Sequence, residues 1–265
     1  MTPDLFDGTT VLVTGASSGI GAALTELLAP TGARLVLVAR DARRTEAVAT
    51  RARALGATVD TVLADLTAPG AVAALVDQVG GRGLVVDHLM NNAGLGVRGP
   101  GAQVPVERQL HLIDLNVRAA TELALRLLPG MLERRRGGIL NVASAAAFQG
   151  LPGLSVYSGT KAYLLTWSEA LHHELRGSGV RCTCLCPGPV DTGFFEVAAM
   201  GTPPAIYSMQ APPAVARAGL RAYGRGASHA MSGPVPRATA WLTRLAPRAL
   251  SVRVAAGFAR PRARL

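Results

Sequence analysis

The sequence predicts an α/β protein with a doubly wound parallel sheet, helices on both faces of that sheet, and a basic C-terminal extension. The main observation is that short apolar runs alternate with longer segments of helical periodicity over the first 196 residues. A glycine-rich turn follows the first apolar run and leads into a helix. Polar turns follow later runs, where parallel sheets of this kind bind ligands. We therefore place one domain at residues 1–233 and the extension at residues 234–265.

The individual elements follow from local patterns of apolar residues. Runs rich in β-branched residues predict buried strands at Thr9–Val13, Arg34–Ala39, Thr58–Ala64, Leu84–Met90, Gly138–Val142 and Val180–Leu185. Helical spacing predicts helices at Ala22–Leu28, Asp41–Leu55, Pro69–Val79, Pro105–Leu128, Tyr157–Leu175 and Ala214–Tyr223. A last edge strand would fall at Ala227–Gly233, but the composition of this segment predicts a strand poorly.

The composition is that of a globular protein. At 265 residues and 49% hydrophobic content, the chain can bury a sizeable core. No apolar run reaches the roughly 18 residues of a membrane span. The N-terminus carries two acids and no basic region, so we expect no signal peptide and a cytoplasmic location. Cys182, Cys184 and Cys186 alternate along one predicted strand, so we expect three buried side chains on one face and no metal site.

The net charge of +10 comes from the C-terminal part of the chain. Residues 197–265 contain ten arginines and no acid, which leaves 17 basic and 17 acidic residues before them. Within this part, Arg237–Phe258 predicts a basic amphipathic helix interrupted by a proline, with Trp241, Leu242 and Leu245 on its apolar side. This pattern is typical of a peripheral contact with the inner face of a membrane, and equally of packing on the domain or on a second subunit. A nucleic-acid partner is not expected.

The turn after the first strand has the features of a nucleotide site. Residues 14–21 read T-G-A-S-S-G-I-G. Gly15, Gly19 and Gly21 lack Cβ atoms, so the backbone can approach a pyrophosphate at the N-terminus of the following helix. The spacing is G-x-x-x-G-x-G rather than the commoner G-x-G-x-x-G. The alternative is a glycine-rich turn without a ligand.

The end of the second strand indicates which dinucleotide would bind. An acid at this place would bind the ribose 2′-hydroxyl of NAD, but the strand ends in Ala39 and Arg40. An arginine favours a 2′-phosphate, and therefore NADP. Arg43 and Arg44 support this interpretation, whereas Asp41 weakens it. The alternative is that Arg40 only precedes the next helix.

Lys161 is the only lysine of the chain, and Tyr157 precedes it by four residues. On a helix these two side chains share a face. An ammonium beside a phenol favours the phenolate and lowers the phenol pKa, which makes Tyr157 a candidate proton donor and acceptor. Taken alone, the pair is a weak signal that two exposed side chains on a surface helix explain better. Asn116 lies inside a predicted helix, where asparagine is unfavourable.

Several motifs occur together and in order. T-G-A-S-S-G-I-G, N-N-A-G, Ser144, Y-S-G-T-K and P-G-P-V-D-T give residues 8–195 a specific resemblance to the short-chain dehydrogenase/reductase family. The resemblance implies a Rossmann-type fold and an oxidoreductase that prefers NADP(H). It also implies a catalytic tetrad of Asn116, Ser144, Tyr157 and Lys161. In this tetrad Tyr157 would transfer a proton, Ser144 would bind the substrate oxygen, Lys161 would hold the nicotinamide ribose, and Asn116 would hold a water.

The resemblance implies a cofactor site built from the turns after the strands. Its residues would be Gly15, Ser17, Ser18, Gly19, Ile20, Gly21, Arg40, Asp65, Leu66, Asn92, Ala93, Gly94, Pro187, Gly188, Val190 and Thr192, together with Tyr157 and Lys161. In this family the region after the last motif usually forms a substrate lid, here about residues 193–225.

The predicted reaction is hydride transfer between NADP(H) and a carbonyl or secondary alcohol, with reduction of an apolar ketone or aldehyde favoured. An apolar substrate is suggested by Phe194, Phe195, Met200, Ile206, Tyr207 and Met209 in the expected lid. A homodimer or homotetramer is expected from the family. The alternative function is a non-catalytic NADP-binding sensor or scaffold on the same fold.

Overall fold

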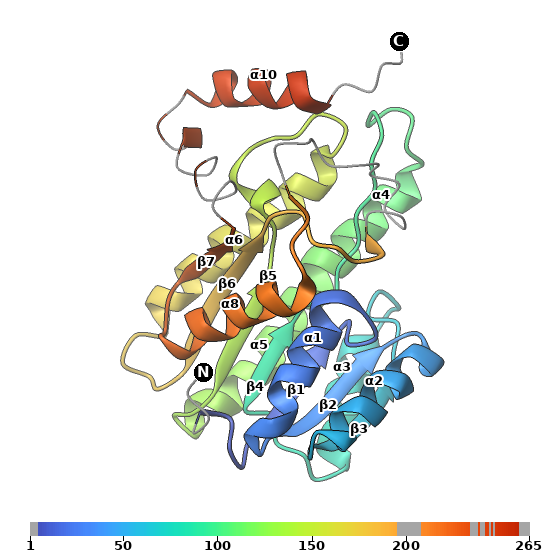
Figure 1. Cartoon of the computed structure of the whole chain (residues 1–265), viewed down its shortest axis with the longest axis vertical. Coiled ribbons are helices and arrows are strands. Elements are labelled where there is room, and N and C mark those ends of the chain that lie inside the picture. Colours follow the sequence, from blue (N-terminus) through green and yellow to red (C-terminus); the bar gives the residue numbers. More distant parts are fainter. Residues whose placement is uncertain are drawn as a thin grey trace.

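The computed structural model describes residues 5–194, 208–233, 238, 242–243, 245 and 247–259. It contains a seven-stranded sheet with the order β3-β2-β1-β4-β5-β6-β7, and every adjacent pair is parallel (Figure 1). The strands are β1 Thr10–Thr14, β2 Arg34–Ala39, β3 Thr58–Leu63, β4 His88–Asn91, β5 Gly138–Val142, β6 Arg181–Pro187 and β7 His229–Ser232. This order is the doubly wound, Rossmann-type arrangement that the alternating pattern predicts.

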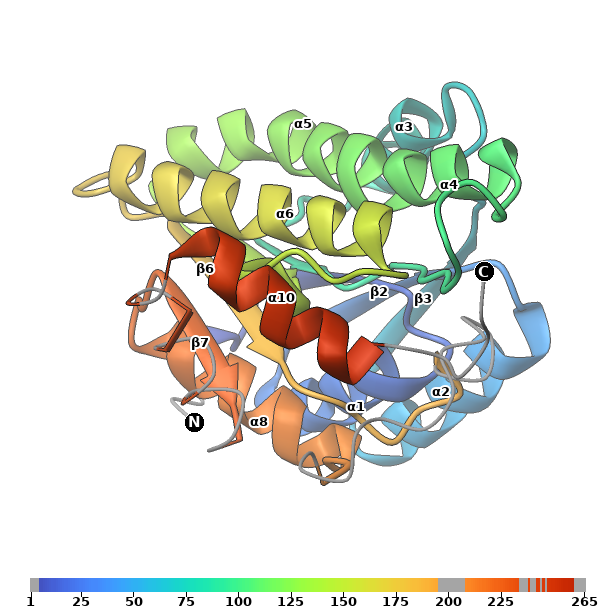
Figure 2. The same ribbon diagram turned by 90° about the horizontal axis from the view of Figure 1, so that it is seen from above.

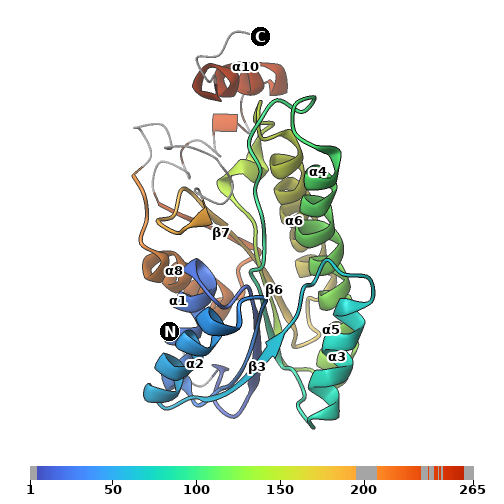
Figure 3. The ribbon, with the colours of Figure 1, turned by 90° about the vertical axis from the view of Figure 1, so that its right-hand side faces the viewer.

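Helices cover the sheet in two layers (Figures 2 and 3). One layer contains α1 Gly19–Leu28, α2 Ala42–Ala54 and α8 Pro212–Gly224. The other contains α3 Ala71–Gly81, α4 Val106–Ile113, α5 Ala120–Glu133 and α6 Ser155–Glu174. Short helical turns are the 3₁₀ turns η2 Ala29–Thr31 and η4 Ala145–Phe148 and the π-helical turn η3 Asp114–Ala119. Above the carboxyl ends of the strands lies one more helix, α10 Arg248–Ala259.

Strand residues alternate between two apolar cores, one under each helix layer. On β1, Val11 and Val13 join the core that also contains Leu24 of α1, whereas Leu12 faces the core that contains Leu123 of α5. All five side chains are fully buried. Because helices cover both faces of the sheet, the central strands β1 and β2 carry apolar residues on both faces, whereas the edge strands β3 and β7 are more polar and less buried.

The cysteine prediction is confirmed in its geometry. Cys182, Cys184 and Cys186 are free, buried and on one face of β6, toward α6. The sulfur atoms of Cys184 and Cys186 lie 3.9 Å apart. Burial raises the pKa of the Cys182 thiol to about 12, which makes it an unreactive small apolar side chain.

Two elements depart from what local composition favours. The last strand expected at Ala227–Gly233 is present despite its poor composition, because β7 pairs with β6 from Cys184 to Pro187. The expectation that the preceding long helix ends at Leu128 is wrong, since it continues to Glu133 with Pro129 inside it. Proline has no backbone N–H, so Pro129 cannot donate a hydrogen bond to the carbonyl oxygen of Leu125. The side chain of Leu125 is 49% exposed. This position is therefore at the surface, where water can hydrogen-bond that oxygen.

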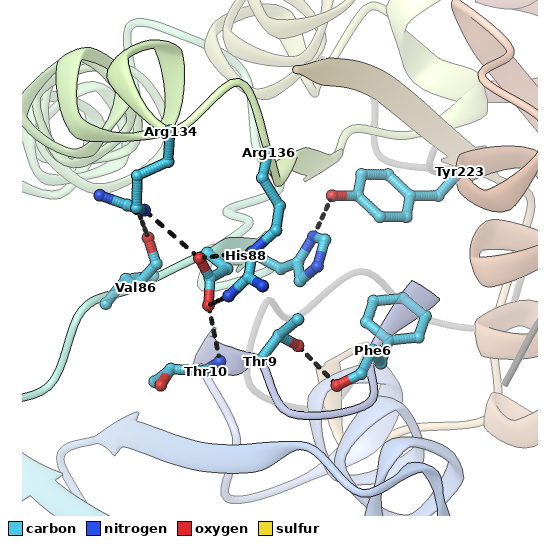
Figure 4. A network of polar contacts seen from close by, with 9 residues as sticks. Phe6, Thr9, Thr10, Val86, His88, Arg134, Arg136 and Tyr223 are labelled. Atoms are coloured by element: carbon cyan, nitrogen blue, oxygen red, sulfur yellow. Dashed lines mark hydrogen bonds and ion pairs between the residues drawn. The ribbon is translucent and has the colours of Figure 1, made fainter. Parts of the chain in front are cut away.

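An ionic cluster around one buried carboxylate lies at the amino-terminal edge of the sheet (Figure 4). The side chain of Asp87 is 5% exposed and accepts hydrogen bonds from Arg136 at 3.3 and 3.1 Å. Arg134 Nε lies 3.5 Å from the same carboxylate, and the backbone N–H of Thr10 donates to it at 3.1 Å. The cluster joins the start of β1 to the loops before β4 and β5.

His88 lies beside this cluster in an aromatic setting. Its Nδ1 is 2.6 Å from the hydroxyl oxygen of Tyr223, and the ring of Phe6 packs edge-on to it at 5.0 Å (Figure 4). Burial lowers the pKa of His88 from 6.5 to about 4, because the charged imidazolium cannot be solvated there. His88 is therefore neutral at physiological pH.

We expect His88 to make the fold sensitive to acid. Its folded-state pKa lies below its ordinary value, so the stabilisation is complete above pH 6.5 and is lost as the pH falls toward 4. Between pH 6.5 and 5, protonation of His88 in the unfolded state should lower the free energy of unfolding by about 2 kcal/mol. Urea unfolding at both pH values measures the loss. The loss should shrink in His88→Asn and persist in the control His173→Asn, which changes an exposed histidine; equal losses in both variants would contradict the assignment.

Candidate active site

The predicted site residues converge on one cavity of about 760 Å³ at the carboxyl ends of the strands. The cavity is lined by every predicted cofactor residue except Gly21, which lies just behind the glycine turn. Ser144, Tyr157 and Lys161 of the predicted tetrad also line it. Asn116 is fully buried behind the lining.

The glycine turn has the shape of a cradle that side chains would fill. Gly15 and Gly19 have φ values of +64° and +54°, which favour glycine. A Cβ atom at Gly15 would lie 2.9 Å from the Cα of Ala93, and one at Gly19 would lie 2.8 Å from Cγ2 of Thr192. A Cβ atom at Gly21 would overlap the carbonyl oxygen of Gly15. Because α1 begins at Gly19, the turn presents a helix N-terminus to the cavity, which suits a pyrophosphate.

The loop after β4 holds this turn in place. The hydroxyl oxygen of Thr14 accepts hydrogen bonds from the backbone N–H groups of Asn92 and Ala93 at 3.0 and 2.9 Å. The side-chain amide of Asn92 donates to the carbonyl oxygens of Thr14 and Gly15 at 3.0 and 3.3 Å. The N-N-A-G motif therefore ties two neighbouring strand ends together under the cavity.

Arg40 and Asp41 follow β2 and have separate roles. Asp41 caps α2, because its carboxylate accepts from the N–H of Arg44 at 2.9 Å. Arg40 lines the cavity with a 56% exposed side chain and lies 3.9 Å from Asp65. A hydrogen bond from Thr67 lowers the pKa of Asp65, so its carboxylate is ionised. Asp41 and Arg44 line the cavity as well, but they are paired with one another, with Arg44 Nε 3.5 Å from the Asp41 carboxylate.

Tyr157 and Ser144 lie together on the cavity wall. Tyr157 is 8% exposed, and its burial raises the pKa of the phenol to about 12. A hydrogen bond from Ser144 opposes this shift because it favours the phenolate. The expectation that Lys161 lowers the phenol pKa is wrong for this arrangement, since burial dominates and the Lys161 ammonium lies 6.0 Å from the ring centroid. At neutral pH Tyr157 is protonated.

Lys161 is buried beside Tyr157. Its Nζ donates to the carbonyl oxygen of Val142 at 3.0 Å, and burial lowers its pKa to about 8. A Cβ atom at Gly94 would lie 3.2 Å from this Nζ and 3.2 Å from Oδ1 of Asn116. The absence of a side chain at Gly94 therefore allows Lys161 and Asn116 to approach one another.

Asn116 comes from the π-helical turn η3, which explains its place inside a helix. Its amide accepts from the N–H of Leu95 at 2.9 Å and donates to the carbonyl oxygen of Leu95 and the hydroxyl of Thr160 at 2.9 and 3.1 Å. The wider turn directs the side chain to the loop after β4 instead of leaving it to compete for helical backbone bonds. Asn116 thus joins α6 to that loop behind the cavity.

Sequence reasoning missed part of the lining. Arg98, Leu151, Pro152 and Leu154 come from loops, and Ala255 comes from α10. Loop residues give no periodic signal, and the position of Ala255 depends on a helix far from the motifs. Of the expected lid, Phe194 lines the cavity and Met209 is 40% exposed. Phe195, Met200, Ile206 and Tyr207 lie outside the described residues, as do Arg237, Trp241 and Arg244 of the extension.

Comparison with known proteins decides the family. Residues 9–200 match the model of the short chain dehydrogenase family. The chain belongs to the short-chain dehydrogenase family. It is 40% identical over 210 residues to an oxidoreductase of Myxococcus xanthus, a match that covers 78% of this chain and 80% of that protein. Membership of the family makes the chain an oxidoreductase that uses a nicotinamide cofactor.

Two further relatives agree with this membership. The ketoacyl reductase HetN of Nostoc is 34% identical over 215 residues, covering 81% of this chain and 75% of that protein. A short-chain dehydrogenase from Sphingobium yanoikuyae, solved in complex with NADPH, is 33% identical with a TM-score of 0.79. That alignment covers 89% of this chain and 93% of the other.

The single lysine makes the active-site electrostatics directly measurable. We expect the ε-carbon signal of ¹³C-lysine-labelled protein to titrate near pH 8, because burial lowers the Lys161 pKa. NMR spectra recorded from pH 6 to 11 give the value without assignment. Midpoints near 10.5, the ordinary value, would show that Lys161 is exposed and would contradict the described geometry.

Proposed function

We propose that this short-chain dehydrogenase reduces apolar ketones or aldehydes with NADPH, using Asn116, Ser144, Tyr157 and Lys161. The observation that carries the proposal is the hydrogen-bonded Ser144–Tyr157 pair on the wall of a cavity that also contains the glycine cradle. Two hydroxyl groups at one point can bind a carbonyl oxygen and supply its proton. The alternative, a sensor or scaffold, has no use for such a pair.

The proposed chemistry divides between cofactor and protein. NADPH supplies the hydride when bound. Tyr157, with a pKa near 12, keeps its proton at neutral pH and donates it to the substrate oxygen as negative charge develops there. Ser144 donates a hydrogen bond that stabilises the same oxygen. The Lys161 ammonium binds the nicotinamide ribose, and Asn116 positions the loop beside Lys161.

The preference for NADP(H) rests on Arg40. Asp41 also lines the cavity at the end of β2, but its carboxylate is engaged by the N–H of Arg44 as the cap of α2 and by the Arg44 guanidinium at 3.5 Å. The Arg40 guanidinium can therefore make charge-assisted hydrogen bonds to a 2′-phosphate. The NADPH complex of the Sphingobium relative supports the same cofactor.

The apolar substrate class rests on what surrounds Tyr157. Leu95, Ala146, Leu154 and Phe194 pack near its ring, and the centroid of Phe194 lies 5.8 Å from that of Tyr157. All four also line the cavity. A ketone with an apolar substituent would remove this surface from water, at about 25 cal/mol per Å² of apolar area.

Replacement of Tyr157 by Phe tests the proposed function. Loss of the proton donor should lower the rate of ketone-dependent NADPH oxidation by ~10²–10⁴ and leave NADPH affinity nearly unchanged. The matched control is Tyr163→Phe, which removes an exposed hydroxyl from the same helix. Activity of Tyr157→Phe within a few-fold of wild type would remove Tyr157 from the mechanism.

We further propose a homodimer or homotetramer. Val106, Leu110 and Ile113 form an exposed apolar stripe along α4, with exposed fractions of 61%, 53% and 41%. Their spacing places them on one face of the helix, and a second copy of the chain would bury that face. Light scattering of the purified protein reports the oligomeric state.

A peripheral contact with an anionic membrane is also proposed. Within the described residues, no helix combines the length and apolar character needed to cross a bilayer. The C-terminal segment instead exposes Leu242, Leu245, Leu250 and Val254, by 65%, 78%, 52% and 54%. These side chains lie in the part of the chain that has ten arginines and no acid. Each basic residue near an anionic surface contributes roughly 1 kcal/mol of attraction.

Vesicle flotation tests this contact. The protein should float with phosphatidylserine-containing vesicles at low salt and less at high salt, because salt screens the attraction. Leu250→Asn combined with Val254→Asn should weaken flotation, whereas Leu55→Asn, at an exposed leucine of the domain, should not. If the wild type stays out of the vesicle fraction at low salt, or if the double variant instead dissociates an oligomer, the exposed face packs on protein.

A further inference from the structure

Helix α10 lies over the cavity, although it is outside the residues that match the family model. It begins at Arg248, directly after Pro247, and crosses above the carboxyl ends of the strands (Figure 2). Its two buried residues, Ser251 and Ala255, are one turn apart and are 9% and 5% exposed. One face of α10 therefore packs on the domain, and Ala255 on that face lines the cavity.

The contacts of α10 place it at the substrate end of the cavity. A Cβ atom at Gly150 would lie 3.5 Å from Cγ2 of Val252, so α10 packs on the loop between η4 and α6. That loop also supplies Leu151 and Leu154 to the lining and runs into the helix of Tyr157. The wall formed by α10 therefore stands beside the catalytic hydroxyl groups.

We propose that α10 is the outer wall of the substrate site and that Ala255 sets the size of substrate it admits. This inference rests on the proposed reductase function. A methyl group at residue 255 leaves room between α10 and the apolar surface around Tyr157, and each added carbon would take up that room. The side chains of Leu250 and Val254 lie on a neighbouring, exposed face of the helix.

Enlargement of Ala255 tests the inference. Ala255→Leu should lower kcat/KM by about tenfold or more for bulky ketones and within about twofold for small ones, since a few methylenes in an apolar pocket discriminate on this scale. Ala255→Gly should shift the preference in the opposite direction. The control Val254→Leu makes a similar enlargement on the exposed face and should change neither class. NADPH affinity should be the same in all variants.

Binding measurements separate this inference from the proposed function. Calorimetric titration of the NADPH-loaded proteins with alcohols of increasing size involves no turnover, because cofactor and alcohol are both already reduced, and it should show the same size limit. If the wild type reduces no ketone, the proposed function fails, while the binding series still tests α10. If Ala255→Leu and Ala255→Gly bind bulky and small alcohols with the same affinities as the wild type, α10 is not the substrate wall. The same conclusion follows if these variants alter only the affinity for NADPH.

Discussion

The close approach of the turn after β1 to the loop after β4 is the constraint on which the site depends. Thr14 accepts two backbone hydrogen bonds from that loop, and Asn92 donates two to the turn. The two segments can come this near only because Gly15 and Gly21 have no Cβ atoms. The same approach aims the N-terminus of α1 into the cavity and positions Gly94 between Asn116 and Lys161.

Burial controls the chemistry at the other end of the cavity. It raises the pKa of Tyr157 and lowers that of Lys161, so the phenol keeps its proton and the ammonium becomes easier to neutralise. These shifts favour proton donation to a substrate oxygen over proton abstraction from an alcohol at neutral pH. Hydrogen bonding by Ser144 moderates the rise in the Tyr157 pKa.

Much of this arrangement could be predicted from the sequence, and the limits have physical causes. The motifs follow the carboxyl ends of the strands or lie in the helix after β5. A parallel sheet with the order β3-β2-β1-β4-β5-β6-β7 therefore brings Gly19, Arg40 and Tyr157 to one cavity. The direction of the Tyr157 pKa shift could not be predicted, because desolvation depends on how the whole cavity closes. For the same reason no local pattern indicates that Ala255 reaches the cavity.

Two segments distant from the motifs, β7 and α10, show where local sequence patterns do not suffice to predict the structure. Residues 229–232 form an edge strand because each of them pairs with a residue of Cys184–Pro187 in β6. Their own composition does not favour a strand. The amphipathic extension also depends on what packs against it, because in α10 Ser251 and Ala255 are buried against the domain whereas Leu250 and Val254 are exposed.

The most direct test of the central claim, that the glycine turn is a cradle for NADP(H), is the dissociation constant for NADPH measured by nicotinamide fluorescence. Gly19→Ala should weaken binding strongly, because the methyl group would meet Thr192 at the mouth of the turn. Gly8→Ala is the matched control, since Gly8 has a similar φ of +61° and open space around it. It should cost stability but leave the dissociation constant unchanged. NADPH binding by Gly19→Ala as tight as by the wild type would contradict the account.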